Sequence, residues 1–520
     1  MDAIDLSLFV SRMASACEEM GAVLKRAALS PNIKDRLDFS CAVFDRHGRL
    51  CAQAAHIPVH LGSMAYAMSA IVSRFEWGEG DVVVLNDPFL GGTHLPDVTV
   101  VAPIMHDGCL VGFVANRAHH ANIGSPSPGS MPLSTTLEEE GLVIEPVKLF
   151  DGGQLVPAVA ERLQTLESGA PGQQLPGDFW AQVSAARTGL HRLGTLIETR
   201  GPDAFLDGLA AMNDYAARVS DKVLRQLPEG IWSFTDSMDS DGAGAEDIPI
   251  QVTLTVADGR LHFDFAGTAA QVAGNINCPL SVTAAAVYYV VRCLLPPQVP
   301  DCAGAFASVA LEAPEGTLVN ATGPAAVAAG NVETSSRLVD VILGVLAQVI
   351  PARIPAAAQG TMNNVAMGSR VSGQCWDYYE TIAGGTGGHQ ESAGLDAVQS
   401  HMTNTLNTPI ESLERHYPLR VLSYAVRRQS GGAGRHPGGN GVVREYEFLG
   451  PADVTLLTER RRRGPWGLAN GAAGQPGINR LNEARVGEKA RFKVAPGDRL
   501  SIETPGGGGW GTKTKYNGQD

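Results

Sequence analysis

Three short apolar runs in the N-terminal quarter of the chain constrain its fold more than any other feature. Residues 82–85 read Val-Val-Val-Leu, and residues 98–104 and 110–115 are similar runs rich in β-branched side chains. An Asn-Asp-Pro turn follows the first run, and an Asp-Gly turn separates the other two. The segment therefore predicts three neighbouring strands whose ends and loops present polar side chains.

Five side chains at these strand ends could bind a metal or carry a proton: Asp87, His94, Asp97, His119 and His120. An Asp before Pro usually stabilises a turn, so we assign Asp87 to the turn. His94 and Asp97 have a short chelating spacing, and an imidazole with a carboxylate suits zinc, iron or manganese. On spacing alone, a metal site with His119 as a further ligand and a set of solvated loop residues remain open alternatives.

The residues before this segment add further candidates. Residues 3–28 have apolar side chains at helical spacing and predict an amphipathic helix, and residues 42–54 predict a hairpin. Asp38, at the entry to that hairpin, is by itself typical of a turn. His56 and His60 flank a proline, which favours a loop. They are either structural, hydrogen-bonded histidines or proton carriers of the same pocket, and we expect the second.

The rest of the chain alternates between helical and strand patterns. Helices are predicted at residues 178–199, 203–227, 281–295 and 332–349, and a hairpin is predicted at residues 250–265. The fold class is therefore mixed α/β (α+β) and multi-domain, with an N-terminal strand-loop region that carries the candidate metal-binding residues and a β-rich C-terminal part. The expected divisions are an N-terminal metal-site region (1–176), a helical hairpin (177–230), an α+β middle region (231–370) and a Gly-rich, β-dominated region (371–520).

The glycine content is high, 60 of 520 residues, and part of it lies in short runs such as Gly384–Gly388. A loop of this kind can bind a phosphate through its backbone N–H groups. The signal is weak, because no GxxxxGK[ST] motif is present in the chain. We expect no ATPase activity from this chain alone.

Bulk composition excludes several classes of protein. The net charge of −14 disfavours nucleic acid and anionic membranes as partners. The eight cysteines have no CxxC pairs, which disfavours zinc ribbons and disulfide scaffolds and favours a reducing compartment. Charged residues interrupt the apolar positions of the first residues, unlike a signal peptide, and no apolar run is long enough to span a bilayer. We expect a cytoplasmic protein.

Several motifs, taken in order, resemble those of one known family. They are Asn86-Asp-Pro, Gly91-Gly-Thr-His-Leu-Pro-Asp97 and Ala115-Asn-Arg-Ala-His-His-Ala121. These resemble signatures of the hydantoinase B/oxoprolinase family, and the resemblance runs from about Ser30 to Gly511. The family includes ATP-dependent hydantoinases, 5-oxoprolinase, lactamases of similar design and related subunits of acetone and acetophenone carboxylases.

The resemblance implies a function and a complete site. It implies an ATP-dependent hydrolase that opens a hydantoin, 5-oxoproline or lactam ring after a large hydantoinase A-type partner has phosphorylated the amide with ATP. It also implies that an acidic ligand occupies the Asp-Phe-Ser motif. The expected ligands of one zinc or manganese ion are then Asp38, His94, Asp97 and His119, with His120, His56 or His60 relaying protons. Two other interpretations stay open, an ATP-dependent ketone carboxylase subunit and a non-catalytic scaffold with a structural metal.

Overall fold

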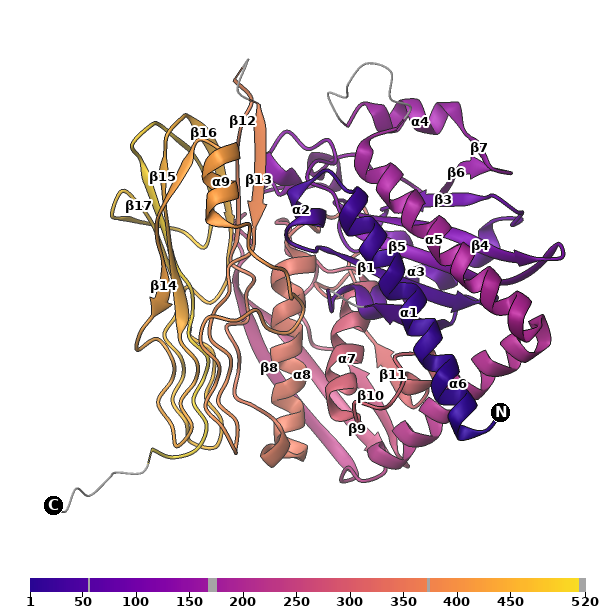
Figure 1. The fold of residues 1–520 in the computed structure, drawn as a ribbon. Coiled ribbons are helices and arrows are strands. Elements are labelled where there is room, and N and C mark those ends of the chain that lie inside the picture. Colours follow the sequence, from indigo (N-terminus) through magenta and orange to yellow (C-terminus); the bar gives the residue numbers. More distant parts are fainter. Residues whose placement is uncertain (55–56, 167–174, 372–374, 514–520) are drawn as a thin grey trace.

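A computed structural model describes residues 1–54, 57–166, 175–371 and 375–513, and Figure 1 shows how its elements are arranged. The prediction of a mixed α/β chain with several sheets is confirmed. None of the helices in these ranges is both long and apolar enough to cross a membrane. The α-helices are α1 (Ala3–Ala27), α2 (Pro31–Lys34), α3 (His60–Ile71), α4 (Pro157–Gln164), α5 (Gly177–Arg200), α6 (Pro202–Leu224), α7 (Leu280–Leu294), α8 (Ser335–Val349) and α9 (Ile410–His416).

The N-terminal part is built on a seven-stranded antiparallel sheet. In spatial order its strands are β2 (Leu50–Ala54), β1 (Phe39–Asp45), β5 (Cys109–His119), β4 (Asp97–His106), β3 (Val82–Leu85), β6 (Val147–Asp151) and β7 (Gln154–Leu155). The three apolar runs of the sequence are thus β3, β4 and β5, side by side in this sheet.

Helices cover both faces of this sheet, which explains why β1 and β3 are buried along their whole length. Cys41 of β1 faces the main core, which also contains buried residues of α1 and α5. Its neighbour Ala42 packs with Met64 and Met68 of α3 in a second cluster. Successive side chains of a strand point to opposite faces, so the two helical layers lie on opposite sides of the sheet.

The middle of the chain forms a four-stranded sheet next to α8. Its strands, in spatial order, are β11 (Val309–Glu312), β10 (Arg260–Asp264), β9 (Glu246–Ala257) and β8 (Gly230–Ser240). The hairpin predicted at residues 250–265 is confirmed, because β9 and β10 pair in antiparallel register. Helix α3 packs on α7, α7 on α8, and α8 on β8 and β9, so these helices connect the two sheets.

The C-terminal part contains two sheets that share a separate apolar core, seen at the left of Figure 1. The first consists of β13 (Trp376–Glu380), β12 (Asn364–Ser369), β16 (Ala452–Leu457) and β19 (Lys489–Val494). The second consists of β14 (Leu419–Arg427), β15 (Gly441–Phe448), β20 (Arg499–Glu503), β17 (Ile478–Leu481) and β18 (Ala484–Val486).

The glycine runs form a layer of closely packed backbone segments. The N–H groups of Gly385, Gly388 and Gly507 donate to the carbonyls of Pro505, Gly508 and Gly439, respectively, at 2.8–3.1 Å. A Cβ atom on Gly387 would lie 1.7 Å from the Ala356 carbonyl oxygen, so only glycine allows this spacing.

The suggestion that Gly384–Gly388 binds a phosphate is therefore not supported. The N–H groups of Gly384, Gly385, Thr386 and Gly388 all donate to carbonyls of neighbouring segments. A phosphate cradle needs N–H groups that are free to donate to the ligand. The glycines serve close packing of backbone segments instead.

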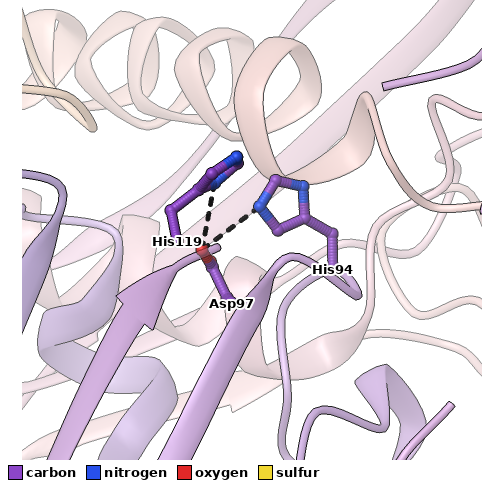
Figure 2. A group of neighbouring side chains, drawn as sticks. All are labelled: His94, Asp97 and His119. Carbon is purple, nitrogen blue, oxygen red and sulfur yellow. Dashed lines mark ion pairs between the residues drawn. The ribbon is translucent and has the colours of Figure 1, made fainter. Parts of the chain in front are cut away.

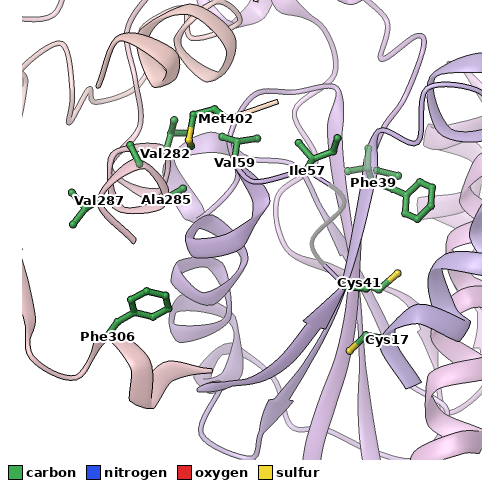
Figure 3. Close-up of a cluster of buried hydrophobic side chains, with 14 of the residues drawn as sticks. Cys17, Phe39, Cys41, Ile57, Val59, Val282, Ala285, Val287, Phe306 and Met402 are labelled. Atoms are coloured by element: carbon green, nitrogen blue, oxygen red, sulfur yellow. The ribbon is translucent and has the colours of Figure 1, made fainter. Parts of the chain in front are cut away.

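The main core extends from α1 to the region where the candidate site residues meet. Figure 3 shows the part of this core that contains Ile57, Val59 and Met402. The backbone N–H of Val59 donates to the carbonyl of Met402 at 3.3 Å, which joins two segments far apart in sequence. This contact forms one wall of the candidate site.

Candidate metal centre

Strand register brings two of the candidate ligands together. Asp97 is the first residue of β4 and His119 is the last residue of β5, and the two are directly paired in the antiparallel ladder. The Asp-Gly turn between the strands thus returns the chain to the same edge of the sheet. His94 joins them from the short loop that precedes β4, where Gly91 (φ 96°) lies against the backbone of Ala67 in α3.

The three side chains converge on one point (Figure 2). The Nε2 atom of His94 is 3.3 Å from Oδ1 of Asp97, and Nδ1 of His119 is 3.4 Å from the same oxygen. Both distances exceed the usual hydrogen-bond range of about 2.7–3.2 Å. Two atoms bound to one tetrahedral ion at zinc-like distances would lie about 3.3–3.5 Å apart, so the spacing fits shared ligands better than hydrogen bonds.

Unsatisfied buried atoms also fit a bound ion. Within the described ranges, Nε2 of His94 and Oδ1 of Asp97 have no hydrogen-bond partner. His94, Asp97 and His119 are almost completely buried, with exposed fractions of 0–3%. Buried polar atoms are normally paired, because desolvation without a partner is costly. A divalent cation would satisfy Asp97 and His94 together.

Surrounding groups fix the orientation of Asp97 and His94. The other oxygen of Asp97 accepts hydrogen bonds from Thr93 Oγ (2.5 Å) and Asn331 Nδ2 (3.2 Å), and lies 3.4 Å from Nε2 of His60. Nδ1 of His94 lies 3.1 Å from the carbonyl oxygen of Ala328, to which it can only donate. This contact leaves Nε2 of His94 as the ligand atom, a usual arrangement in metal sites.

Electrostatics favour an ionised Asp97 beside a neutral His119, whereas the pKa of His94 is raised. Burial alone would raise the pKa of Asp97, but His94, His119 and His60 hold it well below 3.8. Burial lowers the pKa of His119 below 6.5, although Asp97 opposes this. Burial also acts to lower the pKa of His94, but Asp97 and the Ala328 carbonyl raise it. An ionised Asp97 and a neutral His119 are the protonation states that bind a metal ion.

A small cavity adjoins the cluster. Its volume of about 20 Å³ is enough for roughly one water molecule. The polar lining consists of Asp38, His60, Asp97, His119, Asn331, Tyr379, Thr381 and Thr403. The apolar lining consists of Ile57, Val59, Val332, Met362 and Met402. The cavity is too small for a molecule much larger than water.

The remaining predicted residues occupy different positions. Asp38 lines the cavity, but it is not one of the three residues whose ligand atoms lie within 4.8 Å of one another. Its carboxylate is 3.8 Å from Arg36, and its carbonyl accepts the N–H of His119 at 3.0 Å. His60 lines the cavity beside Asp97. His56 lies outside the described residues.

His120 faces away from the cluster. Its Nε2 is 2.9 Å from Oε1 of Gln182, and its ring lies 4.5 Å from that of Phe179. Both partners belong to α5, on the helical layer that covers the sheet. His119 and His120 diverge because consecutive side chains at the end of a strand point to opposite sides.

Several cavity residues carried no clear signal in the sequence. Asn331 lies in a π-helical turn, η6 (Gly330–Thr334), directly before α8, and Tyr379 lies on β13 of the C-terminal part. Thr403 belongs to the largely polar segment 401–408. No spacing rule connects these segments to His94, because tertiary packing alone brings them together.

Comparison with known proteins gives a consistent result over the whole chain. The family model described as hydantoinase B/oxoprolinase matches residues 2–513. The chain is 38% identical to 5-oxoprolinase 1 of Arabidopsis thaliana over 98% of its own length, but spans only 42% of that protein. It is 30% identical to the B-type subunit of a putative D-/L-hydantoinase from a Pseudomonas strain, covering 98% of this chain and 90% of that one.

A solved structure shows the same fold. The ATP-dependent caprolactamase of Pseudomonas jessenii superposes with a TM-score of 0.91 at 28% sequence identity. The match covers 98% of this chain and 91% of the caprolactamase chain.

Proposed function

The chain belongs to the hydantoinase B/oxoprolinase family, and from this membership we propose that it is the metal-dependent hydrolytic subunit of an ATP-dependent cyclic amidohydrolase. Its substrate is a hydantoin, 5-oxoproline or a lactam, and it acts as a cytoplasmic hetero-oligomer with a large ATP-binding subunit of the hydantoinase A type. The observation that carries the proposal is the buried group of His94, Asp97 and His119 beside a small cavity.

The reaction needs two kinds of assistance, because a ring amide is a poor electrophile. In the partner subunit, ATP phosphorylates the amide oxygen and leaves as ADP. Addition of one water molecule to the activated carbon and cleavage of the C–N bond then open the ring and leave an acyl phosphate. A second water molecule hydrolyses the acyl phosphate to the carboxylate and phosphate. One ATP and two water molecules are consumed overall, and the products are a carboxylate, an amine (a urea group when the ring is a hydantoin), ADP and phosphate.

The residues of this chain have separate roles in the proposal. His94, Asp97, His119 and Asp38 would hold one zinc or manganese ion, which would lower the pKa of bound water and so supply a nucleophile near neutral pH. Thr93 and Asn331 keep the Asp97 carboxylate in one orientation. His60 lines the cavity and has one ring nitrogen 3.1 Å from Ser40 Oγ, so it can transfer protons to and from the reacting groups.

The cavity favours a catalytic site over a structural one. Structural zinc sites leave no position for water, whereas catalytic sites keep one. Room for about one water molecule beside Asp97 and His119 matches the second type. The same cluster would also serve a ketone carboxylase, so the reaction itself must be tested.

Reconstitution with the A-type partner tests the function. The pair is incubated with ATP and, in turn, with hydantoin, 5-oxoproline and a lactam, while ADP and the ring-opened product are measured. We expect one ring to give ADP and product together, and the chain without its partner to release no ADP. A bicarbonate-dependent product from a ketone, without ring opening, would instead assign the carboxylase reaction.

A further inference from the structure

Tyr379 connects the candidate metal centre to the C-terminal part of the protein. It lies on β13, and its ring stacks on the imidazole of His119 with centroids 5.1 Å apart and planes 8° apart. The preceding residue, Tyr378, belongs to the separate C-terminal core and contacts Tyr417 instead. Neighbouring tyrosines on one strand therefore contact two different cores.

The Tyr379 side chain is held in place from several directions. Its hydroxyl donates to Oδ1 of Asn364 at 2.7 Å, and Nδ2 of Asn364 donates to Glu333 at 2.6 Å. The guanidinium carbon of Arg36 lies 4.8 Å from the ring centroid, and the same Arg36 side chain donates to the Tyr379 carbonyl at 3.0 Å. The ring therefore has little freedom to move.

The two imidazoles of the cluster differ in how they are oriented. His94 has the carbonyl of Ala328 as a partner for its second nitrogen. For His119, Nδ1 faces Asp97, and no described residue forms a hydrogen bond with Nε2. Histidine ligands almost always have a hydrogen-bond partner on the second nitrogen, which fixes the ring plane. Among the described residues His119 has no such partner, so other contacts must orient its ring.

We propose that Tyr379 is the positioning residue of His119, and that stacking on its ring replaces the missing hydrogen bond. The inference rests on the metal site of the proposed function. If Tyr379 has this role, the affinity for the ion depends on how β13 packs against the N-terminal sheet. Metal binding and the packing of the C-terminal part are coupled through one aromatic ring.

Metal affinity of the chain alone tests this proposal. Dissociation constants for Zn²⁺ and Mn²⁺ are measured by competition with a chromogenic chelator, and the absorption spectrum of the Co²⁺-loaded chain reports ligand geometry. Tyr379→Leu removes the stacked ring and should weaken binding about 10- to 100-fold, the usual cost of losing an outer contact of a ligand. Tyr379→Phe keeps the ring and should bind like the wild type.

Tyr378→Leu is the matched control, since it makes the same change one residue away in the other core. It should lower thermal stability without changing the metal affinity or the Co²⁺ spectrum. If Tyr379→Leu binds the metal as tightly as the wild type, the positioning role is overturned but the metal site is not. The same holds if Tyr379→Phe or Tyr378→Leu loses as much metal affinity as Tyr379→Leu. A wild-type chain that binds no divalent ion overturns the metal site and this inference together.

Discussion

Asp97 and His119 are directly paired residues at one end of the β4–β5 ladder, and Nδ1 of His119 lies 3.4 Å from Oδ1 of Asp97. The strand pairing that forms the sheet therefore also assembles the candidate metal centre. If β5 were shifted by one residue against β4, His120 rather than His119 would lie opposite Asp97. The side chains of β5 would then point to the opposite face of the sheet. The core on both sides of the sheet prevents such a shift.

This geometry separates the neighbouring histidines experimentally. We expect His94→Ala to lose stoichiometric zinc or manganese and all activity with the partner, because a ligand atom with no other described partner is removed. His120→Ala should keep the ion, because its ring contacts Gln182 and Phe179 instead. Elemental analysis of the purified variants measures this. Retention of the ion by His94→Ala and its loss from His120→Ala would contradict the assignment.

Asp38 and His60 are the two candidates for the fourth ligand of the ion. Both line the cavity, and only His60 contacts Asp97 directly. If Asp38 is the fourth ligand, Asp38→Asn should lose the ion, while His60→Gln should keep it and slow turnover of the reconstituted pair by roughly 10²- to 10⁴-fold as a lost proton carrier. Metal content and turnover are measured on the same preparations. If His60→Gln loses the ion and Asp38→Asn keeps it, His60 is the fourth ligand and Asp38 is the proton carrier.

The sequence predicted those parts of the site that local rules control. The His-x-x-Asp spacing pointed to His94 and Asp97, and the Asp-Gly turn between two apolar runs explains how His119 returns to them. Nothing in the spacing distinguished His119 from His120, which required family resemblance or the alternation of side chains in a strand. Tyr379 and Asn331 depend on how β13 and α8 pack against the first sheet, and no local pattern encodes such packing.

The fold was predictable to a similar extent. Periodicity predicted the helices near residues 3–28 and 178–199 and the hairpin at 250–265, and the structure contains α1, α5 and the β9–β10 pair there. The glycine runs were open to a wrong interpretation, because composition cannot show whether an N–H group is free. In the structure these groups are used by neighbouring backbone segments.

The close packing of the glycine layer predicts that a side chain added there lowers the stability of the fold. Gly387→Ala would place a Cβ atom 1.7 Å from the carbonyl oxygen of Ala356, so the backbone must shift. We expect the free energy of unfolding to fall by about 1–3 kcal/mol, as for other overpacked sites. Gly194→Ala is the control, because this glycine lies in α5 with no atom within 4 Å of the new Cβ. It should be neutral or stabilising by up to about 1 kcal/mol. Denaturant unfolding of both variants measures the difference.

The last prediction concerns Arg460, which joins the C-terminal part to the middle sheet. Its guanidinium donates to Asp236 of β8 and to Asp340 of α8, both at 2.8 Å, and Arg460 and Asp340 are buried. Arg460→Met removes the positive charge but keeps most of the volume, so the two carboxylates lose their shared partner. Removing one member of a buried ion pair costs about 3–5 kcal/mol. Arg462→Met is the control from the same arginine run, because its ion pair with Glu246 is largely exposed and should contribute little.

The pH dependence of the stability lost in Arg460→Met shows whether the missing charge or the missing packing causes it. Burial would raise the pKa of Asp236, but Arg460 and Arg337 hold it below 3.8 in the wild type. A lowered carboxyl pKa contributes stability that is present above about 3.8 and is lost as the pH falls through the folded-state value. In Arg460→Met the buried carboxyl is easier to protonate, and protonation relieves its unpaired charge. The difference in unfolding free energy between wild type and variant should therefore be larger at pH 7 than at pH 4, whereas a difference independent of pH would indicate that lost packing, not lost charge, destabilises the variant.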